Sequence, residues 1–177
     1  MSAASRSRRA WGWYQLDDRW AARLVADAAV PPGALVFDLG AGTGALTGHL
    51  LDTGARVVAV ELHPGRAQRL RDRFAGRRLT VLELDVLDLR IPTGPYRVVA
   101  NPPWGIASPL VRLLTSRRSG LVAADLLLPR AVVRRHADAG GPGRWRSEHA
   151  TPVPRHAFRP APQVDAAVLR LRASGRR

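Results

Sequence analysis

Three glycines at every second position form the segment of this sequence best suited to holding a ligand. Gly40, Gly42 and Gly44 follow an apolar run, residues 34–39, that is typical of a short buried strand. Residues 45–51 predict the helix that comes next. Glycines at such a junction let the backbone approach a ligand closely, and the helix start presents unpaired N–H groups. The pattern predicts a turn that binds a nucleotide-like molecule, and its spacing also fits the dinucleotide-binding fingerprint.

Two carboxylates stand where later strands are expected to end. Glu61 follows an apolar run over residues 56–60, about 20 residues beyond the glycines, where an acidic residue can hold both hydroxyls of a ribose. Asp85 follows another run over residues 79–84, and a carboxylate there can accept a hydrogen bond from the amine of an adenine. With Asp38 at the first strand, these acids predict a site for a ligand that contains adenosine.

The tetrapeptide Asn101-Pro102-Pro103-Trp104 follows a further apolar run, residues 96–100. The amino nitrogen of an adenine is a poor nucleophile because its lone pair is delocalised into the ring. The Asn101 side-chain oxygen and the Pro102 carbonyl can accept its two N–H groups and so localise the lone pair for attack. The prolines stiffen the turn, and Trp104 offers a face for stacking a base, worth roughly 1–3 kcal/mol. The plainer alternative is a proline-rich turn with a packed tryptophan.

An alternation of strands and helices is needed to bring these residues together. Further strands are predicted over residues 120–128, 151–158 and 165–172, and further helices over residues 17–29, 64–74, 108–115 and 130–137. The alternation predicts an α/β fold with a mainly parallel seven-stranded sheet and helices on both faces. In such folds ligands bind beyond the carboxyl ends of the strands.

The composition indicates one globular domain with a polyanionic partner. The 177 residues have a mean hydropathy of −0.13 and a formal net charge of +14, and the chain has no lysine. That surplus favours nucleic acid or an anionic membrane surface, and an arginine-rich genome is the plainer explanation. No apolar run approaches the ~20 residues that span a bilayer, and the N-terminus lacks the apolar core of a secretory signal. Since cysteine is absent, which fits a reducing compartment, we expect a cytoplasmic protein.

The motifs at these spacings resemble those of class I S-adenosylmethionine-dependent methyltransferases, which have a Rossmann-like fold. Within this class the chain resembles the Erm family of ribosomal RNA adenine-N6 methyltransferases, and in particular its short actinobacterial members. The family is related to the small-subunit rRNA dimethyltransferases. The resemblance covers about residues 11–172 and is carried by residues 44–47, 59–64 and 158–168. The last of these, Phe-Arg-Pro-Ala-Pro-Gln-Val-Asp-Ala-Ala-Val, resembles a late segment of the family whose phenylalanine flanks the target base.

The resemblance implies an enzyme that methylates N6 of an adenine in 23S rRNA and so confers macrolide-type antibiotic resistance. It implies S-adenosylmethionine as cofactor and no metal, and the five histidines show no metal-ligand spacing. The implied catalytic residues are Asn101, Pro102, Trp104 and Phe158. The implied cofactor-binding residues are Trp13, Gln15, Asp38, Gly40, Gly42, Gly44, Glu61, Leu62, Asp85, Val86 and Asn101.

Arginines beside aromatic residues suit phosphate contact and base stacking. We therefore expect residues 1–15 to be a basic, aromatic arm that binds RNA or, equally, folds onto the core. Residues 16–174 are expected to form the catalytic domain, without a separate C-terminal RNA-binding domain. The candidate RNA-binding residues are Arg6, Arg8, Arg9, Arg134, Arg135 and Arg144. The expected partner is 23S rRNA, protein-free or in an assembly intermediate, and the expected state is a monomer that binds no membrane.

The chain departs from the family pattern in two places. Where the family usually has Gln-Asn-Phe-Leu, residues 12–15 read Gly-Trp-Tyr-Gln. Where most members have Asn-Leu/Ile-Pro-Tyr/Phe, residues 101–104 read Asn-Pro-Pro-Trp, which also resembles DNA adenine and glutamine-N5 protein methyltransferases. Those two activities stay open, as does a non-catalytic RNA-binding or ribosome-assembly factor. An NAD oxidoreductase has only the glycine turn in its favour.

Overall fold

Strands and helices alternate along the chain. The computed structural model describes residues 14–139 and 143–174. The strands are β1 (Gln15–Leu16), β2 (Leu35–Leu39), β3 (Arg56–Val60), β4 (Leu79–Leu82), β5 (Tyr96–Ala100), β6 (Leu121–Pro129), β7 (Trp145–Val153), β8 (Phe158–Arg159) and β9 (Ala166–Ala173). The α-helices are α2 (Asp18–Ala28), α3 (Ala45–Asp52), α4 (Pro64–Arg73), α5 (Ala107–Leu114) and α6 (Arg130–Asp138). Single 3₁₀ turns are η1 (Val86–Asp88), η2 (Trp104–Ile106) and η3 (Arg155–Ala157). No helix within the two described ranges is long and apolar enough to cross a membrane.

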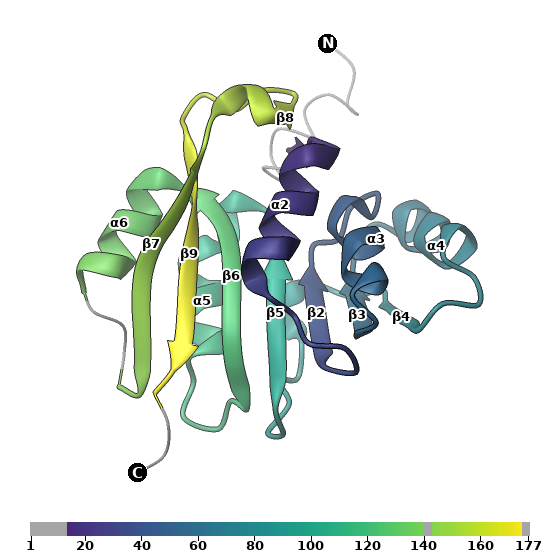
Figure 1. Cartoon of the computed structure of the whole chain (residues 1–177), viewed down its shortest axis with the longest axis horizontal. Coiled ribbons are helices and arrows are strands. Elements are labelled where there is room, and N and C mark those ends of the chain that lie inside the picture. The colour runs from purple at the N-terminus through teal and green to yellow at the C-terminus, as the bar shows by residue number, and fades with distance from the viewer. Residues whose placement is uncertain (1–13, 140–142, 175–177) are drawn as a thin grey trace.

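Seven strands form one sheet in the order β4-β3-β2-β5-β6-β9-β7 (Figure 1). The strands from β4 to β6 in this order are parallel, and β9 runs antiparallel to both of its neighbours. This is the mainly parallel seven-stranded sheet that the sequence predicts. The chain builds outward from β2 to β4 and then returns to place β5 on the other side of β2. Such a switch point is where open α/β sheets bind ligands, at the carboxyl ends of the strands.

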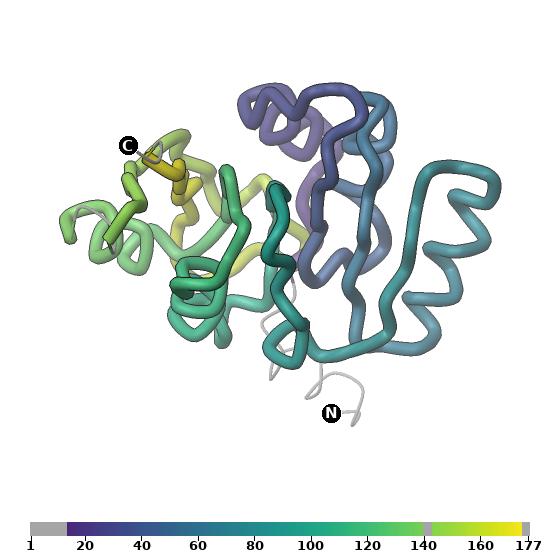
Figure 2. The backbone as a smooth tube through the Cα atoms, turned by 90° about the horizontal axis from the view of Figure 1, so that it is seen from below, coloured from purple at the N-terminus to yellow at the C-terminus, as the bar shows by residue number. Residues whose placement is uncertain are grey.

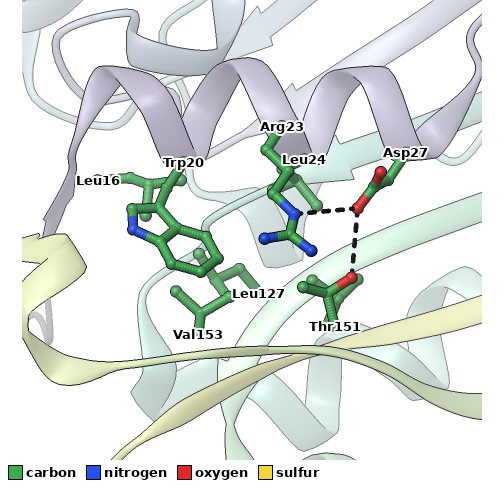
Figure 3. Close-up of a pocket in the computed structure, with 9 residues that line it drawn as sticks. Leu16, Trp20, Arg23, Leu24, Asp27, Leu127, Thr151 and Val153 are labelled. Carbon is green, nitrogen blue, oxygen red and sulfur yellow. Dashed lines mark hydrogen bonds and ion pairs between the residues drawn. The ribbon is translucent and has the colours of Figure 1, made fainter.

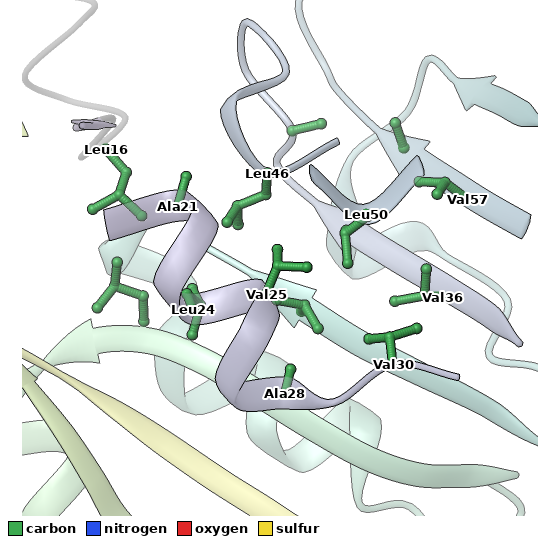
Figure 4. Packing of buried hydrophobic residues seen from close by; sticks show 14 of the residues in the cluster. Leu16, Ala21, Leu24, Val25, Ala28, Val30, Val36, Leu46, Leu50 and Val57 are labelled. Carbon is green, nitrogen blue, oxygen red and sulfur yellow. The ribbon is translucent and has the colours of Figure 1, made fainter. Parts of the chain in front are cut away.

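Helices cover both faces of this sheet, because alternate residues of a strand point to opposite faces. Val36 of β2 lies in the apolar cluster that α2, α3 and α4 cover, part of which Figure 4 shows. Phe37 and Leu39, on either side of an acidic residue in the same strand, lie in the cluster that α5 and α6 cover. Figure 2 shows the two helical layers with the sheet between them. The sandwich holds the carboxyl ends of β2 and β5 in fixed positions.

Strand β7 lies earlier in the chain than the strand predicted for this part of the sequence. Its expected range was 151–158, whereas β7 begins at Trp145 and ends at Val153. β7 is an edge strand that pairs only with β9, and most of its side chains are at least partly exposed, so it lacks a strong apolar signal. Trp145 is only 3% exposed, which makes it a buried strand residue. Residues 140–142, shortly before β7, lie outside the described residues.

A two-stranded ladder joins the beginning of the described chain to its late segment. β1 pairs antiparallel with β8, so that Gln15 lies opposite Arg159 and Leu16 opposite Phe158. The N–H group of Asp17 extends this ladder by donating to the carbonyl of Ala157 at 2.8 Å. Residues from both ends of the chain therefore meet above the carboxyl edge of the main sheet, next to α2 (Figure 1).

Candidate active site

The glycine turn connects β2 to α3 in a conformation that side chains would disturb. Gly40 and Gly44 have φ values of 76° and 89°, in the left-handed region that favours glycine. A Cβ atom on Gly40 would lie 2.8 Å from Cδ of Pro103, and one on Gly44 would lie 2.8 Å from side chains of α4 and the residue after it. The turn therefore packs against the Asn-Pro-Pro-Trp segment at the neighbouring strand end.

Glu61 is buried at the end of β3 and binds the glycine turn directly. Its Oε2 accepts a hydrogen bond from the N–H of Gly42 at 2.8 Å. Its Oε1 accepts from the N–H of His63 at 2.8 Å and from Arg66, with Nε at 3.0 Å and Nη2 at 2.9 Å. The carboxylate that the sequence assigns to a ribose thus also fixes the position of the glycine turn. Oε2 has the fewer protein partners and keeps more capacity to accept a further hydrogen bond.

Asp38 lies at the end of β2, one residue before Leu39, and is 1% exposed. Its Oδ2 accepts a hydrogen bond of 2.7 Å from the hydroxyl of Thr47 in α3. Burial raises the pKa of the Asp38 carboxyl to about 7, the Thr47 hydrogen bond opposes this rise, and the charge of Glu61 adds to it. Asp38 also lines a small pocket with Gly40 and Asn101. A bound cation in that pocket would lower the pKa and favour the charged carboxylate.

This pKa predicts how stability depends on pH. Between the ordinary carboxyl pKa of 3.8 and about 7, the folded state keeps a proton on Asp38 that the unfolded state loses. Stability is therefore highest below the lower value and falls as the pH rises through the upper one, by up to about 4 kcal/mol from this group. Asp38→Asn removes this pH-dependent contribution to the free energy of unfolding, because asparagine does not titrate. Urea unfolding at several pH values between about 4 and about 8 should show that the free energy of unfolding of the variant rises relative to that of the wild type as the pH rises.

A second carboxamide substitution separates this effect from the loss of any one charge. Asp88→Asn alters an exposed carboxylate in η1 and is the control for the loss of one negative charge. A stability difference between Asp38→Asn and the wild type that does not change with pH would contradict the effect of burial on the pKa of Asp38.

Asp85, Val86 and Leu62 lie around the ends of the neighbouring strands β3 and β4. Asp85 caps η1, with Oδ1 accepting from the N–H of Leu87 at 2.8 Å. Val86 is buried, whereas Leu62 is 38% exposed and follows directly after Glu61. The structure thus brings acids to the ends of three adjacent strands, with an exposed apolar side chain beside them.

Asn101 leaves the end of β5 and is oriented by the beginning of the described chain. Its Nδ2 donates a hydrogen bond of 2.7 Å to the backbone carbonyl of Tyr14. That bond holds the side chain in place and leaves Oδ1 to accept other hydrogen bonds. Tyr14 was not among the predicted site residues, although it lies in the stretch where the sequence departs from the family pattern. Gln15, which was predicted, lines the same small pocket as Asn101 and Tyr14.

Three aromatic rings pack together beside Asn101. Trp104 lies 4.7 Å from Tyr14 and 5.6 Å from Phe158, measured between ring centroids, and meets Phe158 edge to face. Phe158 is only 2% exposed. A base can stack between Trp104 and Phe158 only if these rings separate, because they are now in direct contact. Among the described residues, the indole N–H of Trp104 is also buried without a hydrogen-bond partner. Because a buried N–H group without a partner is unfavourable, this group favours opening of the aromatic cluster when a ligand binds.

The predicted arginines are spread over the molecule. Four predicted residues lie outside the described residues: Arg6, Arg8, Arg9 and Trp13. Arg134 and Arg135 are exposed in the second half of α6, which leads away from the carboxyl end of β6, and Arg135 donates to the hydroxyl of Ser108 at 3.1 Å. Arg135 therefore contacts the first turn of α5, which follows the Asn-Pro-Pro-Trp segment.

Arg144 lies at the other edge of the sheet, just before β7. Its guanidinium donates to the carbonyl of Ser119, near the start of β6, and stacks on the ring of Trp145 at 4.6 Å. The structure does not bring Arg144 together with Asn101. Arg144 instead fixes the corner between β6 and β7.

A methyl donor built on adenosine fits this edge of the sheet. Gly40 has no side chain to block the approach to Asp38 and Asn101, and acids stand at the ends of β2, β3 and β4. The crystal structure of the 23S rRNA methyltransferase ErmE matches with a TM-score of 0.79 and 30% identity, covering 89% of this chain and 68% of that one. A magnesium protoporphyrin IX methyltransferase from Synechocystis, solved with its cofactor bound, shares the fold at 21% identity and a TM-score of 0.62, covering 98% of this chain and 92% of that one. The fold and site define a class I S-adenosylmethionine-dependent methyltransferase.

The particular family follows from the sequence comparisons. The model of the ribosomal RNA adenine dimethylase family matches residues 13–176, and the chain belongs to that family. Ribosomal RNA small subunit methyltransferase A of Thermosynechococcus vestitus is 35% identical over 185 residues, covering 94% of this chain and 70% of that protein. The protein of the same name from Aromatoleum aromaticum is 32% identical over 180 residues, covering 94% and 68%. S-adenosylmethionine is the cofactor, which excludes the NAD oxidoreductase. The resemblance to the Erm family is supported at the level of this wider family.

Proposed function

We propose that this protein transfers a methyl group to N6 of an adenine in ribosomal RNA. The observation that carries the proposal is the anchored Asn101 carboxamide, whose Nδ2 is held by the Tyr14 carbonyl at 2.7 Å while Oδ1 remains able to accept. A fixed oxygen acceptor beside a cofactor turn is what the weakly nucleophilic amine of adenine requires. The family to which the chain belongs supports the same reaction class.

The residues of the Asn101–Trp104 turn and Phe158 would have different roles in the reaction. When bound, S-adenosylmethionine supplies a methyl group on a positively charged sulfur. Asn101 Oδ1 and the Pro102 carbonyl accept the two N6 hydrogens, which favours a localised lone pair on the nitrogen. Transfer from the bound cofactor would form the carbon–nitrogen bond as the carbon–sulfur bond breaks, and the surplus proton would pass to solvent. Trp104 and Phe158 hold the flipped base by stacking, once the aromatic cluster opens.

The acids at the strand ends place the cofactor. We assign Glu61 Oε2 to the ribose hydroxyls, with Oε1 held by Arg66, and Asp85 to the adenine amine. Leu62 and Val86 would flank the adenine ring, and Asp38 would face the positively charged end near the glycine turn. Placement in line with the methyl group then accounts for much of the rate.

We propose 23S rRNA as the substrate and macrolide-type resistance as the outcome, on the likeness to ErmE. Small-subunit rRNA is the second candidate, because the curated relatives named above are small-subunit enzymes at up to 35% identity. Residues 1–15, with Arg6, Arg8 and Arg9, are proposed as an arm that contacts the RNA backbone of a protein-free transcript.

One labelling experiment tests the activity and the substrate together. The purified protein is incubated with methyl-tritiated S-adenosylmethionine and, separately, 23S rRNA, 16S rRNA, duplex DNA and a cell protein extract. Digestion of 23S rRNA to nucleosides should release label as N6-methylated adenosine. Label in 16S rRNA would select the second candidate. Label only in DNA or protein, or cofactor binding without transfer to any substrate, would overturn the proposal in favour of one of the other functions.

A further inference from the structure

A second cavity opens next to the N-terminal turns of α2, outside the cofactor pocket. It has a volume of about 370 Å³ and is lined by Asp17, Arg19, Trp20, Arg23, His156 and Ala157. The first four residues come from the start of α2 and its cap, and the last two from η3. Three of the six side chains carry or can acquire positive charge, and one is a large aromatic ring.

The two arginines have little else to bind. Arg19 is exposed, and the described part of the chain offers it no ion pair. The Arg23 side chain is 59% exposed, and the one ion pair that it makes within the described residues is a long contact of 3.8 Å with Asp27, worth little at a surface. The one acid at the cavity, Asp17, uses its carboxylate to cap α2 by accepting from the N–H of Arg19. The cavity is therefore suited to an anion.

The tryptophan adds a flat surface to this charge. The guanidinium of Arg23 lies 5.4 Å from the Trp20 ring centroid. Figure 3 shows both side chains leaving the same side of α2, with the Trp20 ring packed near Val153 and Leu127. An aromatic ring fixed by packing, with a guanidinium group beside it and a second arginine lining the same cavity, can hold a base and its phosphate in single-stranded RNA.

The position of the cavity relates it to the active site. Asp17 and Ala157 join the β1–β8 ladder through the 2.8 Å hydrogen bond between their backbones. Phe158 lies opposite Leu16 in the same ladder, and its ring and that of Tyr14, which precedes β1, belong to the cluster beside Asn101. The cavity therefore adjoins the ladder that carries two rings of this cluster.

We propose that this cavity is a second RNA-binding site, which holds one nucleotide of the strand that flanks the target adenine. Arg19 and Arg23 bind its phosphate, and Trp20 provides the surface for its base. This inference rests on the proposed function for the identity of the strand. The site would supply RNA affinity within the described domain. Arg144 cannot supply it there, because this arginine lies near the start of β6, away from Asn101.

The test reverses charge at the cavity and, as a matched control, at the opposite edge. The double variant Arg19→Glu/Arg23→Glu is compared with Arg117→Glu/Arg118→Glu, whose exposed arginines lie in the loop before β6. Binding of fluorescein-labelled 23S rRNA fragments and of a single-stranded RNA oligonucleotide is measured over a range of salt concentrations. Affinity for S-adenosylmethionine and the Tm are measured for every variant, so that misfolding is recognised.

The cavity variant should bind RNA at least about tenfold more weakly, with a log–log salt slope shallower by about 0.7 for the one phosphate that is no longer neutralised. Its cofactor affinity and Tm should match those of the wild type, and the control should lose less than about threefold in RNA affinity. Equal losses in both variants would overturn the inference, since they indicate diffuse charge alone. Unchanged RNA binding by the cavity variant would also overturn it. If the wild type binds RNA through these arginines but methylates none, the proposed function fails and the binding site stands.

Discussion

Replacing Asn101 with alanine is expected to lower methyl transfer to rRNA by about 10²–10³-fold, the effect of removing one fixed polar group that acts in the transition state. The alanine variant loses the oxygen that accepts from the adenine amine, and the Pro102 carbonyl alone remains. S-adenosylmethionine should still bind with nearly unchanged affinity, because the glycine turn is held by Glu61 and the backbone of β3. Single-turnover methylation and cofactor titration measure the two effects separately.

Asn101→Asp provides the matched comparison. Aspartate keeps an oxygen at the same place but loses the N–H group that donates to the Tyr14 carbonyl at 2.7 Å. Two acceptors would then face each other, so we expect the side chain to turn away and transfer to fall as well. Full activity in the aspartate variant would show that the Tyr14 bond is dispensable. Unchanged turnover in Asn101→Ala would remove Asn101 from the mechanism.

Gly40→Ala should weaken cofactor binding by at least about tenfold and lower stability by about 2–5 kcal/mol. A non-glycine residue at its φ of 76° costs about 1–2 kcal/mol. The new Cβ would also lie 2.8 Å from Cδ of Pro103, a rigid ring, and overpacking of this kind costs about 1–3 kcal/mol. Relief of that overlap must move the glycine turn, the catalytic turn or both. Isothermal titration with S-adenosylmethionine and urea unfolding measure the two losses.

Gly76→Ala separates backbone strain from steric overlap. Gly76 has the same φ of 76°, but a Cβ there would meet nothing within 4 Å. This control should lose only the stability that the unfavourable φ costs, about 1–2 kcal/mol, and its affinity for the cofactor should not change. If Gly40→Ala behaves like Gly76→Ala in both measurements, the packing of the two turns has no part in cofactor binding.

The sheet could be predicted because its central strands are buried on both faces. Residues 35–39, 56–60 and 96–100 are short apolar runs next to turn-forming residues, and each became a strand within a residue of its expected range. β7 was placed wrongly because an edge strand needs an apolar pattern on one face only, and Pro152 obscured even that. The ladder between β1 and β8 has two residues on each side, too few to produce any periodic signal.

The candidate site divides along similar lines. Residues fixed by local backbone geometry, such as Gly40 at the turn and Asp38 at a strand end, could be predicted from spacing alone. The anchoring of Asn101 by Tyr14 spans 87 positions of sequence and uses a backbone carbonyl, so no residue type marks it. Contacts of Glu61 with Gly42 and Arg66 likewise depend on how β3 and α4 pack. Sequence predicts which side chains can do chemistry, and packing decides how each is held.

The most direct test of the account is a structure of the protein with S-adenosylhomocysteine and an RNA that carries the target adenine. If Asn101 presents the amine for methylation, the complex should show a flipped adenine with N6 within about 2.7–3.2 Å of Asn101 Oδ1, and Trp104 and Phe158 moved apart around the base. The Asn101 Nδ2 bond to Tyr14 should also persist. An adenine amine that faces solvent or another side chain, with Asn101 Oδ1 turned away from it, would contradict the central claim.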